Sequence, residues 1–151
     1  MSVPTWRGLA AGYAAAVLVI PVALCERLVA HCLAALPHEG CGLLVGDPST
    51  ATVTDAIGTR NVAASALFYE VDPAEHLAVE RAAEAAGRDV IGAFHSHTHT
   101  DAWPSATDVA RAADPTWHWL IVSLRMAEPV VRSFRIESER ISEEEISLVE
   151  E

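Results

Sequence analysis

The sequence of 151 residues contains no lysine, only three cysteines and no Cys-x-x-Cys pair. All ten cationic side chains are arginine, so no lysine amine is present for isopeptide attachment. The net charge of −11 leaves no basic patch, which argues against binding to nucleic acid. Three cysteines do not make a disulfide framework, and Cys25 and Cys32 lie about 10.5 Å apart along a predicted helix, too far to bridge. We therefore expect a protein of a reducing compartment, the cytoplasm.

Length and composition predict one globular domain with a region of different character at each end. A chain of this length buries about two thirds of its unfolded surface, and no repeat or low-complexity segment interrupts it. Residues 137–151 hold seven Glu and one Arg, a composition typical of a solvated tail. We interpret residues 1–15 as an extension of uncertain order, residues 16–136 as the domain and residues 137–151 as an acidic C-terminal tail.

The uncharged stretch from Gly8 to Cys25 is long enough to cross a membrane. Pro21 interrupts it, however, and the stretch lacks the basic flank and cleavage site of a signal peptide. We therefore divide it between the N-terminal extension, a first strand over residues 17–20 and the start of a helix at Pro21. A membrane anchor is the less favoured alternative.

The remaining hydrophobic periodicity predicts strands and helices that alternate along the chain. Mixed strands between helices indicate a layered α/β or α+β domain. Helices are predicted over residues 21–36, 73–87 and 105–114, and further strands over residues 41–45, 51–57, 67–71, 90–97, 117–124 and 130–136.

The chemically informative stretch is residues 94–108, where two histidines follow a buried strand. His95 and His97 are spaced i, i+2, so on extended backbone they project to the same face, about 6.5 Å apart. Ser105 opens a helical pattern, which puts Asp108 in its first turn; on their own, these two residues could be only an N-cap and its acidic partner. Two imidazoles, one carboxylate and an open fourth position are typical of a catalytic zinc site.

The pattern His-Ser-His, seven residues, Ser, two residues, Asp resembles the JAMM (MPN+) zinc metalloproteases. The resemblance implies that His95, His97 and Asp108 hold zinc and that a zinc-bound water is the nucleophile. It also implies that Glu39 acts as general base and acid and that Ser105 assists at the oxyanion. The implied fold is a curved mixed β-sheet between helices, a cytidine-deaminase-like MPN fold. The family pattern has no ligand at the position of His99, which we interpret as a residue of the pocket rim or of the solvent-exposed surface.

Other metal-dependent functions fit the sequence less well. A deaminase of similar fold needs Pro-Cys-x-x-Cys, which is absent. Metal-dependent phosphoesterases and amidohydrolases that begin with His-x-His usually need a barrel of over about 200 residues, and this chain is shorter. An MPN scaffold without peptidase activity is the main alternative, although no ligand has been lost. Cys41, two residues after Glu39, is interpreted as a small buried hydrophobic residue.

The short spacing between the motifs resembles the small prokaryotic members of the family, such as the CysO-cysteine peptidases. The resemblance implies hydrolysis of amide bonds after the C-terminal Gly-Gly of a ubiquitin-like or sulfur-carrier protein. The predicted strand over residues 67–71 is the expected place for that tail to bind by β-augmentation. The sequence does not decide the oligomeric state, which could be a homodimer.

Overall fold

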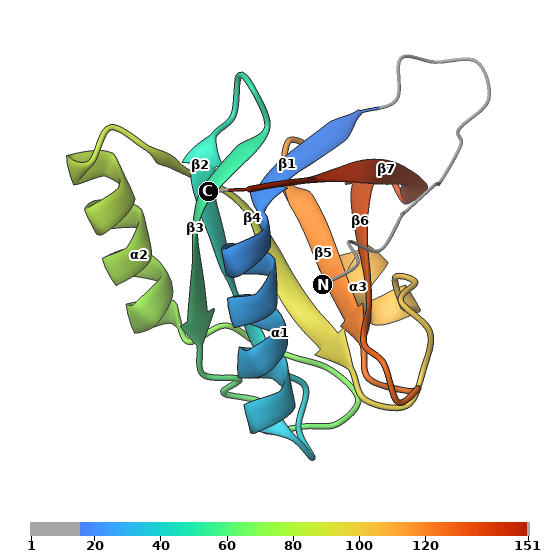
Figure 1. Cartoon of the computed structure of the whole chain (residues 1–151). Helices are drawn as coiled ribbons and strands as arrows, with labels where there is room; N and C mark the ends of the chain where they lie inside the picture. The colour runs from blue at the N-terminus through green and yellow to red at the C-terminus, as the bar shows by residue number, and fades with distance from the viewer. Residues whose placement is uncertain (1–15, 151) are drawn as a thin grey trace.

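Seven strands close into a barrel in the order β1-β3-β2-β4-β5-β6-β7 in the part of the chain that the structure describes. This computed structural model, shown in Figure 1, describes residues 16–150, so the expected extension over residues 1–15 lies outside it. The elements are β1 (Val17–Pro21), α1 (Val22–Ala35), β2 (Cys41–Asp47), β3 (Thr52–Thr59), α2 (Pro73–Ala85), β4 (Asp89–His97), α3 (Ala106–Arg111), β5 (His118–Ser123), β6 (Val130–Glu137) and β7 (Arg140–Val149).

The sheet is mixed, which confirms the predicted fold class. β4 pairs in parallel with β5, and β1 pairs in parallel with both β3 and β7, whereas the other pairs are antiparallel. Closure between β1 and β3 depends on the single pair Val19 and Thr52. In Figure 1, α1 lies across the front of the strands and α2 stands beside β3.

β2 and β5 are buried along almost their whole length because side chains pack on both of their faces. Successive residues of β2 enter two different cores. Leu44 packs in a cluster with Leu28 of α1 and Phe94 of β4, whereas Leu43 packs in a cluster with Val79 of α2. Continuous apolar runs are expected for strands that are covered on both faces.

The C-terminal residues differ from the prediction of a solvated acidic tail. Arg140–Val149 form β7, which pairs with β6 and with β1 and so closes the barrel. Glu144 and Ile146 are buried on one face of β7, while Glu145 between them is exposed. The Glu144 carboxylate contacts His118 Nδ1 at 2.6 Å and accepts a hydrogen bond from Ser133 Oγ at 2.7 Å. These partners make the burial of one carboxylate in the acidic run tolerable.

The predicted strand over residues 67–71 is also wrong. This segment is irregular, apart from an isolated bridge between Asn61 and Val71, and Leu67 is 82% exposed. The Asn61 side chain replaces ladder hydrogen bonds here. Its amide donates to the carbonyl of Phe68 at 3.2 Å, and its oxygen accepts from the N–H of Glu70 at 3.0 Å. A side chain that bonds nearby backbone in this way competes with regular structure.

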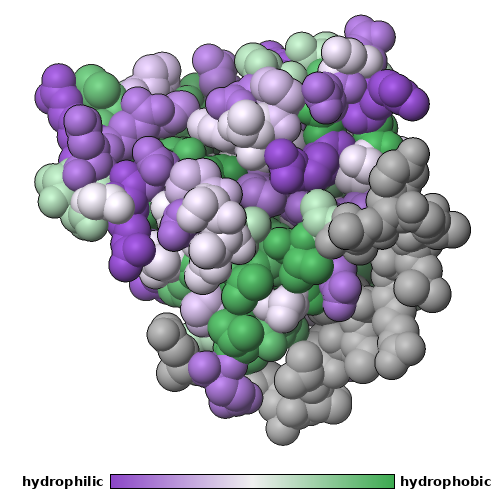
Figure 2. Space-filling view, turned by 90° about the horizontal axis from the view of Figure 1, so that it is seen from above, coloured by the Kyte–Doolittle hydropathy of each residue, from purple (hydrophilic) through white to green (hydrophobic). Residues whose placement is uncertain are grey.

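Within residues 16–150, no helix combines the length and the apolar character needed to cross a membrane. Part of the uncharged stretch considered above, residues 8–15, lies outside the described part, and the rest falls in β1 and the start of α1. Figure 2 shows the molecule from above, with hydrophilic side chains over much of the surface and a hydrophobic area below the centre of the view.

Candidate metal centre

The two histidines of the His-Ser-His motif lie at the end of β4, which runs between β2 and β5. His95 pairs with Cys41 of β2 and with Ile121 of β5, so its backbone is fixed on both sides. Side chains alternate along a strand, so His95 and His97 share one face and Ser96 lies on the other. The Ser96 hydroxyl accepts a hydrogen bond from the N–H of Gly40 at 2.8 Å, and the Ser96 N–H donates to the carbonyl of Gly40 at 2.9 Å.

Asp108 comes from the first turn of α3, and the helix cap fixes its carboxylate. Ser105 is the N-cap residue, and its hydroxyl accepts from the N–H of Asp108 at 3.0 Å. In return, the N–H of Ser105 donates to Asp108 Oδ2 at 2.8 Å. The capping box that was an alternative explanation of these residues is therefore present. It does not compete with metal binding, because the same carboxylate also contacts both histidines.

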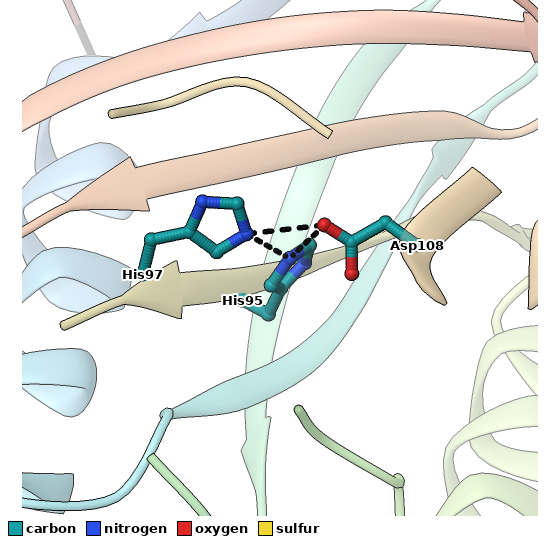
Figure 3. Close-up of side chains that lie close together, drawn as sticks. All are labelled: His95, His97 and Asp108. Carbon is teal, nitrogen blue, oxygen red and sulfur yellow. Dashed lines mark hydrogen bonds and ion pairs between the residues drawn. The ribbon is translucent and has the colours of Figure 1, made fainter. Parts of the chain in front are cut away.

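Three possible ligand atoms converge at this point, as Figure 3 shows. His95 Nε2 and His97 Nε2 are 3.2 Å apart, and they lie 3.1 Å and 3.0 Å, respectively, from Asp108 Oδ2. Ligand atoms at the corners of a zinc tetrahedron are about 3.3 Å apart, given metal–ligand bonds of about 2.0–2.2 Å. The spacing thus fits a metal ion with three protein ligands.

The hydrogen bond on the far side of His97 also fits a metal. His97 Nδ1 lies 2.8 Å from the carbonyl oxygen of Asp101, which can only accept, so Nδ1 must carry the proton. In the neutral ring, Nε2 then presents a lone pair towards a carboxylate oxygen. Such a hydrogen bond, donated by the non-ligating nitrogen, is the usual support of a metal-binding histidine. The repulsion between this lone pair and the carboxylate is removed either by a second proton on the ring or by a metal ion.

The electrostatics of the metal-free cluster depend on burial and on these contacts. Burial opposes ionisation of Asp108, but hydrogen bonds from His95 and His97 outweigh it and hold the carboxyl pKa far below its usual range. For His97, burial is outweighed by the contacts with Asp108 and Asp101, so its pKa is raised. For His95, the more deeply buried ring, burial dominates and the pKa is lowered. Asp108 is therefore ionised, and His95 is biased towards the neutral form that binds metals.

Glu39 is buried near this cluster, with 4% of its surface exposed. Its backbone is fixed on both sides. The N–H donates to the carbonyl of Ser65 at 2.8 Å, and the carbonyl accepts from the Asn61 amide at 3.1 Å. Glu39 Oε1 is buried and has no hydrogen-bond partner among the described residues. Burial raises the pKa of Glu39 to about 8, His97 opposes this rise, and Asp108 adds to it.

The structure separates His99 and Cys41 from the ligand cluster. His99 is exposed, and its Nδ1 lies 2.7 Å from the hydroxyl of Thr98. Cys41 is fully buried, as predicted, with its sulfur 3.5 Å from the hydroxyl of Thr59. Burial raises the pKa of the Cys41 thiol to about 11, so the thiolate does not form near neutral pH.

Two residues of the irregular segment before α2 have contacts that the sequence did not reveal. Asn61 links Glu39 to residues 65–70 through the hydrogen bonds described above. Tyr69 stacks on the His95 ring, with centroids 4.2 Å apart and planes inclined by 20°. Burial raises the pKa of Tyr69 further above neutrality, so the phenol stays protonated. Aromatic residues in this stretch predicted a strand, and nothing in their spacing pointed to a histidine on β4.

Sequence comparisons find one matching family and several relatives. The family described as prokaryotic homologues of the JAB domain matches residues 21–137. The CysO-cysteine peptidase of Mycobacterium tuberculosis is 38% identical over 136 residues, which cover 89% of this chain and 93% of that protein. The desampylase of Haloferax volcanii is 47% identical over 88 residues, covering 58% of this chain and 63% of that protein. A probable TtuB-protein conjugate cleaving protease of Thermus thermophilus is 33% identical, covering 84% of this chain and 81% of that protein.

Solved structures give the same fold. The solution structure of a protein from Desulfitobacterium hafniense matches with a TM-score of 0.82 and 36% identity, covering 89% of this chain and 94% of that one. A JAB1/MPN domain protein from Archaeoglobus fulgidus matches with a TM-score of 0.56 and 19% identity, covering 88% of this chain and 97% of that one. The second likeness supports the fold alone.

Proposed function

Because the chain belongs to the family of prokaryotic JAB-domain homologues, we propose that it is a zinc-dependent peptidase. Its substrate would be an amide bond that follows the C-terminal Gly-Gly of a ubiquitin-like or sulfur-carrier protein. The observation that carries the proposal is the convergence of His95, His97 and Asp108 next to a buried glutamate whose oxygen has no partner in the described chain.

His95, His97 and Asp108 would hold the zinc and leave its fourth position open. When bound by three protein ligands, zinc lowers the pKa of a water molecule towards about 7 and polarises a carbonyl group. The chain supports this ligand set in two ways. The carbonyl of Asp101 fixes the proton of His97 on Nδ1, and the N–H of Ser105 orients the Asp108 carboxylate.

Glu39 is the residue that we propose to move the proton. Amide hydrolysis needs a group that accepts a proton from the attacking water and delivers it to the leaving amine. A carboxylate near neutrality can do both, and burial already brings the pKa of Glu39 to about 8 in the metal-free protein. A nearby cation would lower this pKa, because it stabilises the ionised form. The hydrogen bonds of its backbone to Ser65 and Asn61 would keep the carboxylate in position.

Ser105 is proposed to donate to the oxygen that becomes negative in the transition state. Its hydroxyl oxygen accepts from the N–H of Asp108, which leaves the hydroxyl proton for another acceptor. A donor that the helix cap already holds in place is suited to this role, because little reorganisation is needed during the reaction.

The names of the relatives and the burial of the centre support the choice of substrate. The relatives are named as a CysO-cysteine peptidase, a desampylase and a probable TtuB-protein conjugate cleaving protease. In this chain, His95, His97 and Glu39 are each at most 4% exposed. A scissile carbonyl can approach such a centre most closely when the residues before it lack side chains, and glycine meets this requirement.

The experiment is hydrolysis of a small ubiquitin-like carrier that has an amino acid joined after its terminal Gly-Gly. We expect mass spectrometry to detect release of the amino acid, loss of release after chelation and recovery when zinc is added. Retention of about one zinc per chain without any release would instead support the scaffold alternative. Release that chelation does not affect would contradict a metal-dependent reaction.

A further inference from the structure

The two histidines of the centre are held in different ways. His97 has a hydrogen bond from its Nδ1 to the carbonyl of Asp101. His95 Nδ1 is buried and has no hydrogen-bond partner within residues 16–150. Metal-binding histidines almost always use this second nitrogen to fix the ring. Rotation about the bond that joins the ring to Cβ is otherwise weakly restricted. The polar contacts of the His95 ring are therefore confined to Nε2, which lies 3.1 Å from Asp108 Oδ2, and the plane of the ring needs a further contact on its face.

Tyr69 makes that contact. The centroids of the Tyr69 and His95 rings are 4.2 Å apart, and their planes are inclined by only 20°. Near-parallel packing at this distance restricts how far the imidazole can tilt. The contact between His95 and His97 is longer, at 5.0 Å between centroids, and more inclined, at 60°. Of these two aromatic contacts, the one with Tyr69 is closer and more nearly parallel to the face of the His95 ring.

Arg111 fixes Tyr69 in turn. Tyr69 belongs to an irregular segment, so no strand ladder holds its backbone. Arg111 Nη1 donates to the carbonyl of Tyr69 at 2.9 Å, and the Arg111 guanidinium lies over the Phe68 ring at 5.5 Å. Arg111 is the last residue of α3, the helix that carries Asp108 in its first turn. One short helix therefore supplies a possible metal ligand and also anchors the residue that supports another.

We propose that Tyr69 is a positioning residue that fixes the His95 ring for metal binding, and that Arg111 holds Tyr69 in place. The Tyr69 ring would orient His95 by stacking, as the Asp101 carbonyl orients His97 by a hydrogen bond. This inference rests on the zinc site of the proposed function. The hydroxyl of Tyr69 has no part in it, since only the face of the ring contacts His95.

The test is the zinc dissociation constant, measured by competition with a chromophoric chelator. Tyr69→Leu removes the ring, and we expect the constant to rise about 10- to 100-fold, the usual effect of removing a group that orients a ligand. Tyr69→Phe keeps the stack and should stay within about twofold of the unmodified protein. Absorption of the cobalt-substituted protein should shift in Tyr69→Leu and be retained in Tyr69→Phe, because it reports the geometry around the ion.

The matched control is Leu67→Ala, which changes an 82% exposed side chain of the same segment. It should leave both readouts unchanged, so a response of Leu67→Ala equal to that of Tyr69→Leu would refute a specific role of the ring. If Tyr69→Leu does not fold, Arg111→Gln tests the same arrangement by releasing the Tyr69 carbonyl, and the constant should rise several-fold. Unchanged zinc affinity in the folded Tyr69→Leu protein would overturn the proposal. If Tyr69→Leu does not fold, unchanged zinc affinity in Arg111→Gln would overturn it.

These outcomes differ from failure of the proposed function. If the unmodified protein binds no zinc, or binds it equally well after His97→Ala, then the metal site itself is wrong. If the unmodified protein binds about one zinc through His97 but Tyr69→Leu binds it equally tightly, only the positioning role is wrong.

Discussion

In the metal-free state, the Glu39→Gln protein should be more stable than the unmodified protein, and the difference should grow as the pH rises. Glu39 is buried, one of its carboxylate oxygens has no partner in the described chain, and its pKa is raised to about 8. Below pH 4.5 the carboxyl is protonated in both the folded and the unfolded protein, so it carries no penalty. Between pH 4.5 and about 8 the unfolded state loses this proton while the folded state keeps it. The free energy of unfolding should therefore fall as the pH rises through this window.

The size of the effect follows from the same shift. The pKa rises from 4.5 to about 8, and each unit corresponds to about 1.4 kcal/mol, which gives an upper value of about 5 kcal/mol. Partial solvation of the centre reduces this to about 2–4 kcal/mol. Glutamine has nearly the same shape and does not titrate. The Glu39→Gln protein should thus match the unmodified protein near pH 4.5 and exceed its stability by that amount above pH 8.

The measurement is urea unfolding of both metal-free proteins at several pH values, followed by circular dichroism. Other titrating groups are common to both proteins, so the difference between the two curves isolates residue 39. Added zinc should reduce the difference, because a nearby cation stabilises the ionised carboxylate. A difference that is constant with pH would mean that Glu39 titrates normally and is not held in a desolvated site. Turnover should fall by about three orders of magnitude or more in the same variant, as for loss of a proton shuttle.

Three further substitutions test other parts of the centre. His97→Ala should lose most of the zinc found by elemental analysis, and unchanged zinc content would exclude this residue as a ligand. His99→Ala should keep zinc and most activity, because this exposed ring lies outside the ligand cluster; loss of metal in this variant would reverse the choice of histidines. Ser96→Ala leaves the N–H of Gly40 without its side-chain acceptor, so the free energy of urea unfolding should fall by about 1–3 kcal/mol. Turnover should fall more than zinc content, and wild-type values for stability and turnover would contradict a role of this hydrogen bond.

The elements with a strong local signal could be predicted from the sequence. The apolar run before His95 is a strand, and the i, i+2 spacing gives His95 and His97 the same face of β4. Asp72 and Pro73 begin α2, where the Asp72 side chain accepts from the N–H groups of Ala74 and Glu75. The capping box of Ser105 and Asp108 could also be predicted from the sequence. Each of these features depends on residues within a few positions of one another.

The features that were predicted wrongly or not predicted depend on side-chain partners outside the local pattern. β7 carries a run of acidic residues, and its burial depends on His118 and Ser133, which are 26 and 11 residues from Glu144. The aromatic segment before α2 has strand-forming residues, but hydrogen bonds with the side chains of Asn61 and Arg111 hold it as a loop. The support of His95 by Tyr69 joins two segments 26 positions apart. No local pattern in the sequence reports such a contact.

The proposed hydrolysis of the bond after a Gly-Gly terminus is tested most directly by changing the carrier. Two forms of a ubiquitin-like carrier, each with one amino acid joined after the terminal glycine, would differ only in the penultimate residue, glycine or valine. Mass spectrometry should detect release from the glycine form and a rate at least about tenfold lower for the valine form, since a branched side chain prevents close approach to the buried centre. Equal rates for the two forms, or no release from either by the zinc-loaded protein, would contradict the account.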